Sequence, residues 1–93
     1  MIAPGGTLPA TELKFPADWE FRIVVEDAQY DRARRSVAGC LAAHGAAAEL
    51  AEGLRSGSGR YRTIKARVVL TGREMMERLA ADLAKLDGVR VVL

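Results

Sequence analysis

The chain has 93 residues, which is enough for one domain and too few for two. Its formal net charge is +2 at pH 7 and 28% of its residues are charged, a composition typical of globular proteins and weak evidence for an acidic partner. Cys40 is the only cysteine, which excludes an internal disulfide and a cysteine-rich metal site. We find neither a signal peptide nor an apolar run that could span a membrane, and we expect a soluble cytoplasmic protein without membrane contact.

The N-terminal segment is rich in residues that oppose regular structure. All three prolines (Pro4, Pro9 and Pro16) lie in it, together with a pair of glycines. We predict that residues 1–14 form a flexible tail and that residues 15–93 form a single domain.

The first predicted elements are a strand over residues 19–26 and a helix over residues 29–44. Phe21, Ile23 and Val25 alternate with mostly polar neighbours, which is the pattern of a half-buried strand. Asp27 is a candidate helix cap, and Gly45 is well placed to end the helix in a left-handed conformation. The apolar positions of the helix fall at spacings of three and four: Tyr30, Ala33, Val37, Leu41 and His44.

Two further strands are predicted over residues 47–55 and 61–70, joined by a turn of serine and glycine. In the first of them we place Ala48, Leu50 and Leu54 on one side. In the second, the side chains that face the core are Ile64, Ala66, Val68 and Leu70.

A second helix is predicted from Thr71 to about Leu86, because Thr71 and Glu74 have the spacing of a capping box. Asp87 and Gly88 end it, and residues 89–93 form a last strand.

The predicted order is strand, helix, strand, strand, helix, strand. With right-handed crossovers, this order gives an α+β fold of the ferredoxin-like βαββαβ kind. It has a four-stranded antiparallel sheet of order 4-1-3-2 with both helices on one face. The other face is left uncovered, and there we expect function to lie.

We predict which side chains this uncovered face presents from the alternation along the strands, with Val91 and Leu93 assigned to the helix side. The predicted interaction face consists of Arg22, Val24, Lys65, Arg67, Val69, Arg90 and Val92. Valines rimmed by cations are typical of a protein interface or of sheet-to-sheet dimerisation, although antiparallel sheets also often have one solvated side.

The sequence offers few candidates for catalysis or metal binding. Cys40 and His44 are four residues apart on one predicted helix, but the cysteine lies beside apolar residues and no orienting carboxylate follows from the sequence. One cysteine and one histidine cannot form a four-ligand zinc site. We therefore expect no enzymatic activity, no metal and no cofactor.

Weak RNA binding through the basic side chains is the alternative function. Arg60, Arg62, Lys65 and Arg67 lie along one strand, but Tyr61 is the only aromatic residue there, whereas RNA recognition by this fold normally needs several. The turn from Arg55 to Arg60 could cradle an anion with its backbone amides, although a solvated hairpin turn is the commoner use of such a sequence.

Phe15-Pro16 leads into the strand through Ile23, a turn of serine and glycine leads into Tyr61, and the last stretch runs from Leu86 to Leu93. These stretches resemble the YbeD-like family of small bacterial proteins. The resemblance implies a ferredoxin-like fold similar to the ACT regulatory domains, and no catalytic residues. ACT domains usually bind ligands at a glycine-bearing turn, but residues 26–29 contain no glycine. We thus expect a non-enzymatic binding or regulatory domain that contacts an unknown protein partner or forms a homodimer.

Overall fold

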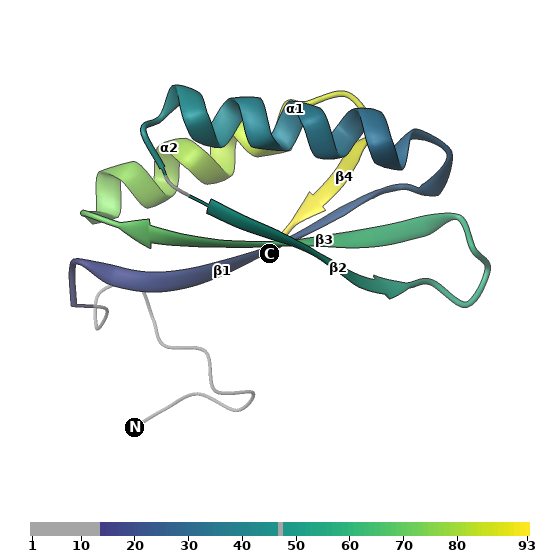
Figure 1. Ribbon diagram of the computed structural model, residues 1–93, viewed down its shortest axis with the longest axis horizontal. Coiled ribbons are helices and arrows are strands. Elements are labelled where there is room, and N and C mark those ends of the chain that lie inside the picture. Colours follow the sequence, from purple (N-terminus) through teal and green to yellow (C-terminus); the bar gives the residue numbers. More distant parts are fainter. Residues whose placement is uncertain (1–13, 47) are drawn as a thin grey trace.

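The computed structural model describes residues 14–46 and 48–93, so residues 1–13 of the predicted tail lie outside the described part. The elements, in chain order, are β1 (Ala17–Glu26), the short 3-10 helix η2 (Asp27–Gln29), α1 (Tyr30–Ala43), β2 (Ala48–Arg55), β3 (Tyr61–Leu70), α2 (Arg73–Ala84) and β4 (Val89–Val92) (Figure 1). The predicted order of strands and helices is confirmed.

The four strands form one antiparallel sheet of order β2-β3-β1-β4, which is the predicted order counted from the opposite edge. Figure 1 shows α1 and α2 on the same side of this sheet. Neither helix covers the other side, which we call the open face. The chain therefore has the α+β, ferredoxin-like architecture that its sequence predicts.

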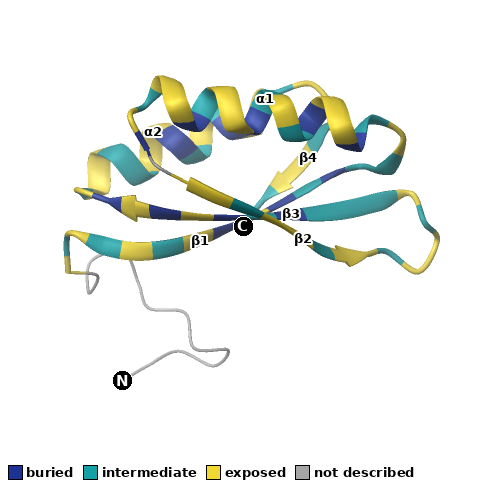
Figure 2. Ribbon diagram, viewed as in Figure 1, coloured by how far each residue is buried: buried dark blue, intermediate teal, exposed yellow. Residues whose placement is uncertain are grey.

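The core lies between the sheet and the two helices (Figure 2). The predicted alternation of β1 and β3 is confirmed, because the buried residues of β1 from Phe21 to Val25 and of β3 from Ile64 to Leu70 are every second one. Each helix contributes one apolar stripe, as helical periodicity requires. The buried side chains are Phe21, Ile23, Val25, Tyr30, Ala33, Val37, Leu41, Ala46, Ile64, Ala66, Val68, Leu70, Leu79 and Leu83.

The C-terminal end of α1 is closed as the sequence predicts. Gly45 has a φ of 70°, and its amide donates to the Ala42 carbonyl at 2.9 Å. The next amide, of Ala46, donates to the Leu41 carbonyl at 2.9 Å. This pair of bonds is the Schellman motif, in which the left-handed residue is usually glycine because it has no Cβ.

The two predicted helix caps are wrong. Asp27 begins η2 instead of capping α1, and its carboxylate accepts a hydrogen bond from the Arg62 Nε at 2.9 Å. The cap of α2 is Gly72, while the Thr71 hydroxyl donates to the Met75 sulfur at 3.3 Å. In both cases the side chain expected to cap the helix instead contacts a side chain farther along the chain, Arg62 for Asp27 and Met75 for Thr71.

The predicted phase of the last strand is also wrong. Val92 pairs with the buried Ile23 and packs against the core, whereas Val91 pairs with Val24 and is 45% exposed. The cause is an irregularity in the pairing: Val25 pairs with Val89, so one extra residue of β4 lies opposite the step from Val24 to Val25. An extra residue in one strand shifts the alternation of all that follow it.

The prediction that Leu54 lies on the same side of β2 as Leu50 is wrong for a similar reason. The register shifts between Glu52 and Arg55, and Leu54 is 84% exposed, whereas Leu50 is partly buried. A Cβ at Gly53 would lie 3.1 Å from the Thr63 Cβ, so glycine lets the two strands approach closely at this point.

Candidate interaction face

The structure brings most of the predicted interaction residues together on the open face. Arg22 pairs with Lys65, and Val24 pairs with Thr63, in the central register of β1 and β3. Arg67 is exposed one pair farther along the face, and Val69 is 51% exposed beyond it. Arg90 is exposed beside the irregular pairing of β4, and Val92 does not belong to the face.

Acidic side chains lie beside the cations of this face. Arg67 pairs with Glu20 on one side and with Glu49 on the other, and the Arg22 Nε lies 3.7 Å from a Glu20 carboxylate oxygen. Opposite charges on directly paired positions of a sheet attract each other. This half of the face is therefore mixed in charge, and it is not the basic surface that the cations alone suggest.

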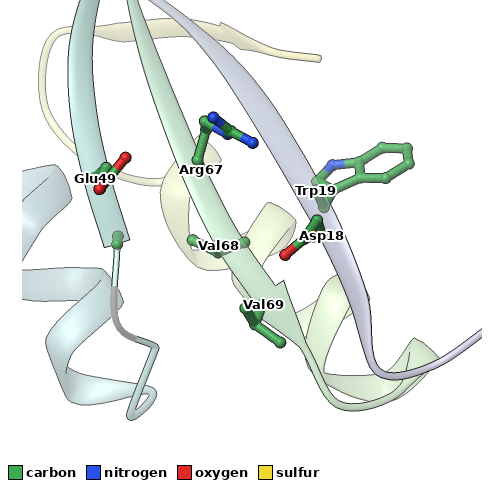
Figure 3. Close-up of a pocket in the computed structure, with 7 residues that line it drawn as sticks. Asp18, Trp19, Glu49, Arg67, Val68 and Val69 are labelled. Atoms are coloured by element: carbon green, nitrogen blue, oxygen red, sulfur yellow. The ribbon is translucent and has the colours of Figure 1, made fainter.

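A shallow hollow of about 360 Å³ lies at the end of this charged region, where β1 starts and β3 ends. Figure 3 shows Arg67 on β3 with Glu49 on the neighbouring strand β2 and Asp18 on β1. Trp19 is another lining residue, and its indole nitrogen is buried without a hydrogen-bond partner among the described residues. The hollow is open and charged, unlike the enclosed and mostly apolar pockets that hold small molecules.

The other half of the face carries an apolar band that crosses all four strands. Val24 lies at its centre, between Thr63 on β3 and Val91 on β4. Leu93 exchanges two backbone hydrogen bonds with Arg22, at 2.8 and 3.0 Å, and is 67% exposed. The apolar band consists of Leu54, Thr63, Val24, Val91 and Leu93.

Leu54 lies at the register shift between Glu52 and Arg55, where the simple alternation of side chains does not hold. We assign it to the apolar band because it is 84% exposed and follows Gly53, whose backbone lies against the Thr63 side chain. Three members of the apolar band were missed by sequence reasoning: Leu54, Val91 and Leu93. A glycine within β2 is the only local signal for the first, and the repeated valines of β4 fit either phase.

Cys40 and His44 do not form a nucleophile and base. The His44 Nε2 instead lies 2.7 Å from an Asp82 carboxylate oxygen and joins the end of α1 to α2. Burial, and secondarily the negative charge of Asp82, raise the pKa of the Cys40 thiol. A raised pKa disfavours the thiolate, which is the reactive form of cysteine.

The Arg55–Arg60 turn and the residue after it use several of their amides internally. The amides of Ser56 and Gly59 donate to backbone carbonyls at 2.8 and 3.0 Å. Those of Arg60 and Tyr61 donate to serine hydroxyls at 3.3 and 3.1 Å. An anion would have to compete with these bonds, so the geometry does not favour the anion cradle.

Within residues 14–46 and 48–93, no three side chains of the metal-binding types lie close enough to hold a metal ion. In that part of the chain, no helix is both long and apolar enough to cross a membrane.

Solved structures with the same fold include those of two other proteins. The solution structure of HP0495 from Helicobacter pylori has a TM-score of 0.74 at 13% identity, covering 95% of this chain and 97% of that chain. A second solution structure of HP0495, described as a hypothetical protein, gives 0.63 at 11% identity, with 96% and 99% covered. The C-terminal domain of MgtC from Mycobacterium tuberculosis gives 0.67 at 19% identity, with 88% of each chain covered. These likenesses concern the fold.

Comparison with protein families gives a more specific result. No curated protein matches the chain. The family described as "Protein of unknown function (DUF493)" matches residues 10–93, which is nearly the whole chain and confirms the resemblance to YbeD-like proteins. The chain therefore belongs to the DUF493 family of small ferredoxin-like domains.

Proposed function

We propose that this chain is a non-enzymatic binding domain that contacts a protein partner through the open face and acts as a regulatory module in the cytoplasm. The observation that carries the proposal is the apolar band, whose outer members Leu54, Val91 and Leu93 are 84%, 45% and 67% exposed. Side chains of this size usually lie in the core, and a group of them beside charged residues is typical of an interaction site.

The arrangement resembles the anatomy of a protein interface. An apolar centre is surrounded by polar side chains that remain near water, here Arg22 and Lys65 on one flank and Glu26 on the other. The apolar atoms supply the gain from burial, while the charged flanks favour some partners and repel others.

The mixed charge of the face supports a protein partner over RNA. Glu20 and Glu49 flank Arg67, so a phosphate that approached Arg67 would also meet two carboxylates. Tyr61 is the only aromatic residue of β3, and it lies at the end of the strand. RNA binding is accordingly the alternative that the experiment below separates.

The proposal is tested by photo-crosslinking in the cells that make the protein. A photoreactive amino acid at Val91 should give a discrete protein adduct, because that side chain lies within the apolar band. The matched control carries the same group at Ala38, which is exposed on α1 away from the open face. A protein adduct from position 91 alone supports the proposal. Adducts to RNA would favour the alternative, and adducts from neither position would contradict the proposal.

A further inference from the structure

We infer that the partner of the open face is a second copy of this chain, related to the first by a two-fold axis that runs across the strands at the level of Val24. This inference rests on the proposed function and names the partner of the same surface. It follows from the way in which charges are distributed on either side of Val24.

On β1, opposite charges lie at equal distances from the centre of the apolar band. Arg22 precedes Val24 by two residues and Glu26 follows it by two, so all three side chains point to the open face. The Arg22 side chain is 64% exposed, and its distance of 3.7 Å from Glu20 is long for an ion pair. It is thus available for a closer carboxylate.

A two-fold axis that lies between the two sheets, over Val24 and perpendicular to β1, exchanges the two ends of the strand. It sets Arg22 of each copy opposite Glu26 of the other, and it brings the two Val24 side chains together. Such a contact is isologous: both copies use the same surface, so the contact between Arg22 and Glu26 forms twice. The two sheets would pack about 10 Å apart, a distance that an arginine and a glutamate can bridge between them.

The same two-fold axis also sets complementary residues of the neighbouring strand β3 opposite each other. Thr63 pairs with Val24, and Tyr61 and Lys65 flank Thr63 by two residues on β3. The axis therefore sets Lys65 of one copy opposite the Tyr61 ring of the other, a pairing in which an ammonium group attracts an aromatic face. Across both central strands, each flank of the apolar band complements the opposite flank.

This geometry also limits the cost of burying charge. Glu20, Glu49 and Arg67 lie farther from the axis than Arg22 and Lys65, so they would remain near the rim of the contact in water. Charges at a rim keep most of their hydration, whereas charges that are fully buried lose it.

The test uses charge reversal on the complete chain and sedimentation velocity from about 10 µM to 1 mM, the range of weak self-association. The wild-type chain should form dimers in this range. Arg22→Glu and Glu26→Arg each create two symmetric like-charge contacts and should each weaken the dimer by about tenfold per contact.

Recombining the charges gives the decisive result. The double variant Arg22→Glu with Glu26→Arg should regain the wild-type dimer. An equimolar mixture of the two single variants should form a heterodimer, because each reversed residue then meets an opposite charge. As a control, Arg78→Glu on the outer face of α2 changes the net charge by the same amount as Arg22→Glu and should leave the dimer intact.

A monomeric wild-type chain at about 1 mM would overturn the inference, as would single variants that dimerise as well as the wild type. So would loss of the dimer without recovery in both the double variant and the mixture, provided that their circular dichroism remains that of the wild type. The proposed function fails separately, if position 91 crosslinks to no protein at all.

Discussion

The guanidinium carbon of Arg62 lies 4.2 Å from the centroid of the Tyr30 ring. The same guanidinium donates from Nε to Asp27 at 2.9 Å, and its Nη1 lies 3.1 Å from a Glu52 carboxylate oxygen. One half-buried side chain thereby joins β3 to η2, to the start of α1 and to the edge strand β2. The Tyr30 hydroxyl in turn accepts a hydrogen bond from Arg34 at 3.1 Å.

Replacing Arg62 should destabilise the domain. Arg62→Gln removes the cation above Tyr30 and leaves Glu52 without its ion-pair partner, so we expect the free energy of unfolding to fall by about 1–3 kcal/mol. Urea denaturation measures the loss. Arg60→Gln is the matched control, because Arg60 is exposed on the same hairpin, and it should change stability by less than about 0.5 kcal/mol. Equal effects of the two changes would contradict the role assigned to Arg62.

The thiol of Cys40 should react slowly. Because burial and Asp82 raise its pKa, less thiolate is present near neutral pH than in an unstructured peptide. Alkylation by iodoacetamide, followed by mass spectrometry, should be slower than that of a cysteine in urea-unfolded chain. Asp82→Asn removes the smaller of the two causes and should increase the rate only in part. A folded-state rate equal to that of the unfolded chain would contradict this prediction.

The raised pKa of Cys40 also predicts a loss of stability in alkaline solution. A folded-state pKa above the unfolded value means that the neutral thiol is preferred in the folded chain. This contribution is fully present below the unfolded pKa and is lost as the pH rises through the folded pKa. The stability of the wild-type chain relative to Cys40→Ala should therefore fall in that alkaline window, and a constant difference would contradict the prediction.

Neighbouring valines of β3 should respond in opposite ways to the same substitution. Val68 is 2% exposed and faces the helices, so Val68→Asp would bury a carboxylate and should unfold the domain. Val69 is 51% exposed on the open face, and Val69→Asp should leave the fold intact. Circular dichroism with thermal denaturation distinguishes the two outcomes. If Val69→Asp unfolded the chain, the open face would be assigned to the wrong side of the sheet.

Two leucines provide a second matched pair. Leu83 on α2 is fully buried, and Leu83→Ala should cost about 2–5 kcal/mol, which is a large part of the stability of so small a domain. Leu54 is 84% exposed, and Leu54→Ala should change stability by less than about 0.5 kcal/mol. A small effect at Leu83 would mean that the apolar stripe of α2 faces another direction.

The sequence by itself determined the elements, their order and most of the core. In β1 and β3, polar and apolar residues alternate clearly, and a shift by one residue would expose the whole apolar set of each strand. The alternation therefore places Ile23 and Ile64 in the core whatever their partners are, and both are fully buried. Gly45 likewise marked the end of α1, because the left-handed conformation is a local property of glycine.

Only the tertiary structure decided how the edges of the sheet are arranged and which polar groups meet. The phases of Leu54 and Val91 depend on irregular pairing with another strand, and the sequence of a single strand does not contain that information. The carboxylate of Asp27 meets Arg62, and that of Asp82 meets His44, across long separations along the chain. Local spacing describes neighbours in sequence, whereas these contacts exist only after the sheet and the two helices have packed together.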